Sequence, residues 1–209
     1  MHNSPQRDDG DTFDPDTLAY YEKFAPTYSA SGAGGQSRHL ESFLALLAPS
    51  SRILDLGCGG GIDASAMLAQ GFVVDAIEAS PAIAAMAERR MNRPVKVMRF
   101  DELDAVEEYD AVWASASLIH VPRQGLSGIL CRIFAALKPL GLHFASYKTG
   151  RSEGRDSVGR YYNYPSHEEL LNFYRQSAPW QIANVTEYVG GGFEKGSGPW
   201  VAIITQRPR

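Results

Sequence analysis

Cysteine is scarce in this sequence, which has only Cys58 and Cys131 among its 209 residues. Two cysteines cannot form a disulfide-rich framework, and their separation matches no metal-binding spacing. Both lie in segments whose apolar composition predicts burial. We therefore expect two free thiols, a reducing cytoplasmic location and no bound metal.

Long apolar runs are missing as well. No stretch approaches the roughly 20 residues that a membrane-spanning helix needs, and residues 1–9 lack the apolar core of a signal peptide. Positive charge is not in excess either, because the formal net charge is −4 and no basic domain stands out. These absences predict no membrane segment and weaken the case for a nucleic-acid partner without excluding one. The oligomeric state is not readable from the sequence.

What is present is the composition of an ordinary globular protein, with 44% hydrophobic and 21% charged residues. The polar residues 1–13 predict a mobile tail, and residues 14–209 have the length of a single domain. Within that domain we distinguish a helical segment at 14–50, a core at 51–148 and a final segment at 149–209.

Strands and helices alternate through the middle of the chain. Apolar runs predict strands at 52–56, 72–77, 95–99, 111–114 and 141–147. Amphipathic segments predict helices between them, at 62–70, 80–91 and 122–137. Such alternation is typical of βαβ units, which build a parallel sheet.

The two ends of the domain show other patterns. Further elements are predicted there: helices from Pro15, at 36–47 and at 166–176, an irregular segment at 150–164, and an antiparallel hairpin of strands 180–189 and 200–205. Asp14 is the expected N-cap of the first helix. Ser166 and Glu169 form a predicted capping box at the start of the last.

A glycine-rich loop follows the first predicted strand, in Asp55-Leu56-Gly57-Cys58-Gly59-Gly60-Gly61. Glycines at the carboxyl end of a strand let a ligand approach the backbone closely. Gly59, Gly61 and Ala64 also fit the dinucleotide fingerprint G-x-G-x-x-A, so the loop alone is compatible with an NAD(P)-dependent oxidoreductase. Asp55 favours another ligand, since its carboxylate would repel a pyrophosphate and attract the sulfonium and ammonium groups of S-adenosylmethionine.

A second acid, Glu78, ends the second predicted strand, 23 residues after Asp55. An acid at about this distance hydrogen-bonds ribose hydroxyls in nucleoside sites. The competing interpretation is a surface acid that caps the helix beginning at Ser80. We favour the ribose role, because position and spacing agree.

Together these motifs resemble class I (Rossmann-like) S-adenosylmethionine-dependent methyltransferases, specifically the small bacterial type-11/type-25 methyltransferase-domain proteins, over about residues 18–207. The matching segments are 53–61 for the glycine motif, 76–80 for the acidic motif, 100–103 for the adenine loop, 109–114 for the fourth strand and 132–139 for the helix before the fifth. The family then usually has Gly-Gly, where this chain has Leu140-Gly141.

The resemblance implies an α/β fold, a Rossmann-like three-layer sandwich. Its seven-stranded, mostly parallel sheet would have the order 3-2-1-4-5-7-6, with the last strand antiparallel, beneath an N-terminal helical lid. The implied cofactor is S-adenosylmethionine, with S-adenosylhomocysteine as its product. The residues implied to bind it are Asp55, Gly57, Cys58, Gly59, Gly61, Glu78, Ala79, Asp101, Glu102, Leu103, Ala114, Tyr28 and Arg38.

Some of these residues have more specific implied roles. Asp101 would bond the exocyclic amine of adenine, and the backbone N–H of Glu102 would face the ring. Tyr28 and Arg38 would meet the methionine carboxylate of the donor, although Arg38 is equally compatible with an ordinary surface position.

The methyl acceptor is expected over the carboxyl ends of the fourth and fifth strands. His120 is the only histidine placed to act as a base there, with packing before Pro122 as the competing interpretation. The other candidates to contact the acceptor are Tyr20, Ser115, Tyr147, Lys148, Arg151 and Arg160. Basic groups mixed with tyrosines favour a small, carboxylated or aromatic acceptor, or else a solvated lid whose charges pair with one another.

The predicted function is therefore methyl transfer from S-adenosylmethionine to a small molecule. Two alternatives stay open at this point: an NAD(P)-dependent oxidoreductase, and a non-catalytic sensor that binds the methyl donor.

Overall fold

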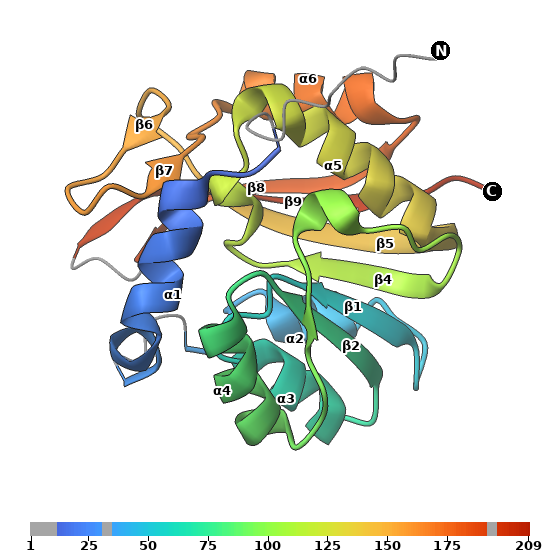
Figure 1. Cartoon of the computed structure of the whole chain (residues 1–209). Helices are drawn as coiled ribbons and strands as arrows, with labels where there is room; N and C mark the ends of the chain where they lie inside the picture. Colours follow the sequence, from blue (N-terminus) through green and yellow to red (C-terminus); the bar gives the residue numbers. More distant parts are fainter. Residues whose placement is uncertain (1–11, 31–34, 192–195) are drawn as a thin grey trace, which may run out of the picture.

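A seven-stranded sheet with helices on both faces forms the body of the protein (Figure 1). The computed structural model describes residues 12–30, 35–191 and 196–209, without the side chains of residues 28–30. The strands of the sheet are β1 (Arg52–Leu56), β2 (Val73–Glu78), β3 (Lys96–Val97), β4 (Tyr109–Ala114), β5 (Leu137–Lys148), β8 (Gln181–Gly191) and β9 (Ser197–Gln206). The helices are α1 (Pro15–Ala30), α2 (Leu40–Leu44), α3 (Ile62–Ala69), α4 (Pro81–Met91), α5 (Arg123–Ala136) and α6 (His167–Ser177), with short 3-10 helices η2 (Phe100–Glu102) and η3 (Leu118–His120).

The strand order is β3-β2-β1-β4-β5-β9-β8. The first five strands of this order pair in parallel, whereas β9 runs antiparallel to β5 and β8 antiparallel to β9. The predicted order and the antiparallel last strand are confirmed. The order reverses between β1 and β4, and ligands of open α/β sheets bind outside the carboxyl ends of the strands at such a point.

Apolar side chains fill both interfaces between the sheet and its helices. One core lies under α5 and α6, and a second joins α2 and α3 to the other face. In the second core Trp113 of β4 stacks on Phe144 of β5, with ring centroids 4.1 Å apart, and Phe43 of α2 packs on both. Helix α1 lies outside these layers, across one end of the sheet (Figure 1).

Local sequence signals specify where several helices begin. The carboxylate of Asp14 accepts a hydrogen bond from the Thr17 backbone N–H at 2.8 Å, as expected of an N-cap. Ser166 and Glu169 form the predicted capping box at α6. Because each cap satisfies an N–H group that the helix leaves unpaired, these starts could be read from short stretches of sequence.

The structure corrects several predicted elements. The helix expected at 36–47 is reduced to α2 with flanking turns, and the strand expected at 95–99 to the two residues of β3. The segment 150–164 is not irregular throughout, because β6 (Gly154–Arg155) and β7 (Tyr161–Tyr162) form a small hairpin. Residues 1–11 of the predicted tail lie outside the described residues.

The predicted burial of Cys131 is wrong. Its helix α5 buries Leu126, Leu130 and Ile133 along one stripe, which leaves the Cys131 side chain exposed on the other side. Among the described helices, none is both long and apolar enough to cross a bilayer.

Candidate functional site

A cavity of about 670 Å³ lies where the carboxyl ends of the parallel strands meet α1. Its wall combines the loop after β1, the end of β2, the residues that follow β4, and the end of β5. Helix α1 contributes Thr17 and Tyr21, and β7 contributes Tyr162. The point where the strand order reverses is thus hollow, and α1 closes it on one side.

The glycine loop forms the wall beside β1. The backbone N–H groups of Gly57 and Cys58 both donate to the carbonyl of Ile77, at 3.0 and 2.9 Å, so the loop is fixed to β2. Gly57 has φ +79°, and a Cβ added to it would lie 2.7 Å from the Cβ of Ser117. Only glycine fits this position without a clash. Burial raises the pKa of the neighbouring Cys58 thiol, which stays protonated at neutral pH.

Asp55 places a buried carboxylate at the bottom of the cavity. Its Oδ2 is buried and has no hydrogen-bond partner among the residues that the structure describes. Burial raises its pKa well above the ordinary range, and the nearby carboxylates of Asp63 and Glu78 raise it further. A group so placed needs a positive charge or a hydrogen-bond donor beside it to ionise favourably.

Glu78 holds the loop and faces the cavity at the same time. Its Oε2 accepts from the Gly59 N–H at 3.1 Å, and its Oε1 accepts from the Ser80 N–H at 3.0 Å. The proposed cap toward Ser80 is therefore present, together with a position on the cavity wall. Burial raises the pKa of Glu78, while the backbone donors act in the opposite direction.

A third acid on the wall, Asp63, was missed by the sequence analysis. It accepts hydrogen bonds from the Ser37 N–H at 2.8 Å and from Trp113 Nε1 at 2.9 Å. Its only sequence signal is an acid in the first turn of a helix, which the helix dipole already explains. Asp63 thus ties the segment before α2 to the centre of the sheet.

The side chains around the corner expected to hold adenine are arranged differently from the prediction. Asp101 does not line the cavity, because Arg99 binds its two oxygens at 3.0 and 3.1 Å and the Thr12 hydroxyl donates to it at 3.0 Å. The Phe13 ring covers the Arg99 guanidinium, 4.4 Å from the ring centroid. Thr12 and Phe13, within the predicted tail, therefore form part of the cavity wall together with Arg99 and Phe100.

Several predicted cofactor residues lie outside the wall. Leu103 and Ala114 are buried in the core, Glu102 bonds the Arg99 N–H, and Gly61 packs against Ala87. Those that do line it are Asp55, Gly57, Cys58, Gly59, Glu78, Ala79 and Arg38. Arg38 donates to the Val189 carbonyl at 3.2 Å. The side chain of Tyr28 is outside the described residues.

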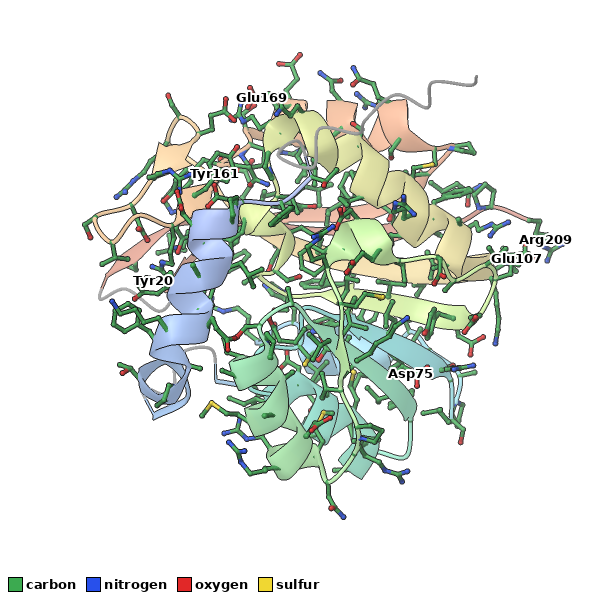
Figure 2. The ribbon with its side chains drawn as sticks, viewed as in Figure 1. Tyr20, Asp75, Glu107, Tyr161, Glu169 and Arg209 are labelled. Carbon is green, nitrogen blue, oxygen red and sulfur yellow. The ribbon has the colours of Figure 1, made fainter. Side chains whose placement is uncertain are left out.

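At the acceptor end, His120 lies at the centre of a hydrogen-bonded chain. Tyr21 Oη is 2.9 Å from His120 Nε2, and His120 Nδ1 is 2.6 Å from the carbonyl of Tyr161. Arg160 donates to Tyr21 Oη at 3.2 Å. Tyr161 lies beside α1 (Figure 2), where its backbone N–H donates to Thr17 Oγ1 at 2.8 Å.

Among the other acceptor candidates, Ser115, Lys148 and Arg160 line the cavity, whereas Tyr20, Tyr147 and Arg151 do not. Tyr147 is buried in the core against Tyr174, so the expectation that it faces the acceptor is wrong. The Lys148 ammonium lies 4.5 Å from the Tyr162 ring centroid.

Among the described residues, only one pair of charges within the hairpin segment matches the alternative expectation that its charges pair with one another, and the others pair with neighbouring elements. Arg160 is fully buried and bonds Asp156 at 2.8 Å, and Arg155 binds Asp14 of the α1 cap at 2.6 Å. Arg151 packs 5.9 Å from the Tyr164 ring centroid instead. The Arg155–Asp14 pair fixes the hairpin to α1. The pair with Asp156 leaves Arg160 less able to bind an anionic ligand than its sequence position suggested.

The buried acids predict a pH dependence of stability. Folding raises the pKa of Asp55 and Glu78 above the unfolded values of about 4, so the folded ligand-free protein binds more protons than the unfolded chain. Their contribution to stability is complete below about pH 4 and is lost as the pH rises through the raised pKa values. Asp55→Asn removes this loss and is expected to stabilise the ligand-free protein by about 1 kcal/mol or more at pH 8.

Urea unfolding of the ligand-free protein at pH 5 and pH 8 measures this effect. Asp104→Asn, at an exposed position outside the cavity wall, is the matched control and should leave the free energy of unfolding nearly unchanged. An Asp55→Asn variant that is less stable than wild type at pH 8 would contradict the expectation.

Comparisons with known proteins agree with this geometry. A family model described as a methyltransferase domain matches residues 33–181. Among curated proteins, the ubiquinone biosynthesis O-methyltransferase of Xanthomonas campestris pv. campestris is 33% identical over 105 residues, which is 47% of this chain and 43% of that protein. The match therefore spans less than half the length of this relative.

Solved structures share the fold at low sequence identity. An S-adenosylmethionine-dependent methyltransferase from Methanosarcina mazei superposes with a TM-score of 0.73 at 16% identity, covering 83% of this chain and 99% of the other. The Burkholderia thailandensis 1,6-didemethyltoxoflavin-N1-methyltransferase, solved with 1,6-didemethyltoxoflavin and S-adenosylhomocysteine, gives 0.73 at 21% identity, covering 93% and 86%. These likenesses establish the Rossmann-like fold.

Proposed function

The chain belongs to the methyltransferase-domain family, and from this premise we propose that it transfers the methyl group of S-adenosylmethionine to a small-molecule acceptor. The observation that carries the proposal is the acidic wall of the cavity, where buried Asp55 and half-buried Glu78 flank the glycine loop. A carboxylate pair attracts a ligand that carries a sulfonium and an ammonium group, and it repels the pyrophosphate of a dinucleotide.

The residues present fit this donor. The unpartnered Oδ2 of Asp55 offers an acceptor to its cationic end, and the carboxylate of Glu78 keeps lone pairs for ribose hydroxyls. The absent side chain of Gly57 lets the ligand lie against the backbone. A volume of about 670 Å³ is within the range of roughly 300–1,000 Å³ of small-molecule sites.

The adenine would lie in the corner formed by Arg99 and Phe100, beneath Phe13. In this structure the carboxylate of Asp101 is hydrogen-bonded to Thr12 and Arg99. Asp101 can therefore bind the adenine amine only if this amine replaces the Thr12 hydroxyl. Arg38 lies on the wall at a place where it can meet a carboxylate. We retain both roles as part of the proposal.

When bound, the donor supplies a methyl group that its positively charged sulfur has already activated. The protein then has to align the acceptor with this methyl group and keep water out. Helix α1 helps to keep water out, since its residues Thr17 and Tyr21 close one side of the cavity. The aromatic rings of Tyr162 and Trp200, also on the wall, favour a flat acceptor.

Calorimetric titration with S-adenosylmethionine, S-adenosylhomocysteine and NADH tests the proposal. We expect the two sulfur compounds to bind with micromolar or tighter affinity and NADH to show no heat of binding. Formation of S-adenosylhomocysteine over an acceptor library then distinguishes an enzyme from a sensor that only binds the donor. Tight binding of NADH in place of S-adenosylmethionine would overturn the proposal.

A further inference from the structure

The hydrogen bonds around His120 have only one consistent direction. The Tyr161 carbonyl can only accept, so at 2.6 Å the proton between them belongs to His120 Nδ1. The guanidinium of Arg160 can only donate, so one lone pair of Tyr21 Oη accepts from it. In the neutral imidazole Nε2 then carries no proton, and the Tyr21 hydroxyl donates to it at 2.9 Å.

His120 is held in the neutral state by its surroundings. Burial lowers its pKa to about 4, and the positive charges of Arg160 and Lys148 act in the same direction. Asp156 and the bond to Tyr161 oppose them. At neutral pH the Nε2 lone pair is therefore available to take a proton from Tyr21.

We propose that Tyr21 and His120 form a proton relay, and that the methyl acceptor is a hydroxyl compound of the phenol class. This inference rests on the proposed function, because it assigns the acceptor of the same cavity. Both side chains line the cavity, and the Tyr21 phenol is near enough to Glu78 for that carboxylate to raise its pKa in addition to the effect of burial. The relay thus borders the donor as well as the acceptor.

The proposed step balances in atoms and charge. The acceptor oxygen forms a bond to the methyl carbon, and the electrons of the breaking carbon–sulfur bond stay on sulfur. The acceptor proton moves to Tyr21 Oη while the Tyr21 proton moves to His120 Nε2. One positive charge leaves the sulfonium and one appears on the imidazolium, which then loses its proton to solvent.

A relay of this kind is needed for a phenol more than for a thiol or an amine. A phenol has a pKa near 10 and is protonated at neutral pH, so its attack is helped by a base. A thiol ionises far more readily, and a neutral amine attacks through its lone pair before losing any proton. The curated relative from Xanthomonas campestris, which is named an O-methyltransferase, agrees with an oxygen acceptor.

Arg160 is a positioning residue in this scheme. Its bond to Tyr21 orients the hydroxyl toward His120, and its position stabilises negative charge that develops on the Tyr21 oxygen during the transfer. The salt bridge to Asp156 keeps the guanidinium in place.

The test uses catechol and two analogues that differ only in the nucleophilic atom, 1,2-diaminobenzene and 1,2-benzenedithiol. The full-length protein is assayed at saturating S-adenosylmethionine, and binding of S-adenosylhomocysteine is measured in parallel. We expect methylation of catechol, with kcat lowered about 100-fold by Tyr21→Phe and by His120→Gln. Affinity for S-adenosylhomocysteine should stay within threefold of wild type in both variants.

Two matched controls make the same chemical changes elsewhere. Tyr109→Phe lies at the amino end of β4, and His167→Gln lies at the exposed start of α6. Both should retain kcat within twofold. With wild type we expect kcat on catechol to be constant from pH 8 to about pH 5 and to fall below, and His120→Gln should lose this fall.

Each other outcome has a definite meaning. Failure of the wild type to bind S-adenosylhomocysteine would sink the proposed function itself. If the donor product binds but catechol is not methylated, or an analogue is methylated in its place, the acceptor class is wrong. If the variants keep kcat within threefold, or if the rate rises tenfold per pH unit up to pH 9, free phenolate is the nucleophile and the relay is excluded.

Discussion

Replacing Glu78 with glutamine is expected to weaken binding of S-adenosylhomocysteine by about 100-fold, or about 2.8 kcal/mol. The two oxygens of Glu78 accept from the backbone N–H groups of Gly59 and Ser80. A glutamine amide has only one oxygen, so its NH₂ group must face one of these donors. The glycine loop loses a fixed contact. The ribose that Glu78 is proposed to bind loses a charged acceptor whose hydrogen bonds contribute about 1.5–3 kcal/mol each.

The stability of the protein should change much less than its affinity. Burial of Glu78 disfavours its charged form, so removing that charge offsets part of the lost hydrogen bonding. We expect a change in the free energy of unfolding below about 1 kcal/mol. Calorimetric titration and urea unfolding of the same preparation separate the two effects.

Glu88→Gln is the matched control for this prediction. Glu88 also accepts a backbone hydrogen bond, from the Val95 N–H at 3.0 Å, but it lies on the outer side of α4 and away from the cavity wall. The control should bind S-adenosylhomocysteine like wild type. An equal loss of affinity in both variants would show that Glu78 acts through general stability and not through the ligand.

The fold could be predicted from the sequence because its signals are local. The alternation of apolar strands with amphipathic helices specifies a parallel sheet, and the position of Asp55 and Glu78 at strand ends places both acids at one edge of it. Their convergence on one cavity then follows from the pairing of β1 with β2. The acidic wall was in this sense predictable from the order of residues along the chain.

The acceptor end was less predictable, because side chains alternate along a strand with a period of two. Ser146 and Lys148 line the cavity, and Tyr147 between them points into the core. The sequence shows that these residues end a strand. It does not show whether the odd-numbered or the even-numbered side chains face the ligand. The same ambiguity separates Ser115, on the wall, from Ala114, in the core.

Contacts between segments far apart in the sequence could not be predicted, for a different reason. Tyr21 meets His120 across 99 positions, and Trp113 meets Asp63 across 50. Periodicity and capping rules describe neighbours within a few residues, so they carry no information about which side chains α1 brings to the cavity. The proposed relay depends on how α1 docks against the sheet, and no local signal in the sequence specifies that docking.

Replacing Gly57 with alanine is expected to lower the free energy of unfolding by about 2–4 kcal/mol and to abolish detectable binding of S-adenosylhomocysteine. The residue has φ +79°, where a side chain costs roughly 1–2 kcal/mol. The added Cβ would also lie 2.7 Å from the Cβ of Ser117 and 3.0 Å from the Phe100 ring, and such overpacking costs typically 1–3 kcal/mol. Because Ser117 and Phe100 both line the cavity, relief of the clash must displace its wall.

Gly71→Ala separates the two contributions. Gly71 has a similar φ of +86°, but no atom of the described residues lies within 4 Å of a Cβ built there, so only the backbone penalty of roughly 1–2 kcal/mol applies. This variant should bind S-adenosylhomocysteine normally and lose about 2–8 °C in Tm, roughly half of the about 4–16 °C expected for Gly57→Ala. If Gly57→Ala instead matched Gly71→Ala in both stability and affinity, the loop would have room to move, and close approach of the ligand to Gly57 could no longer be a basis for assigning the donor.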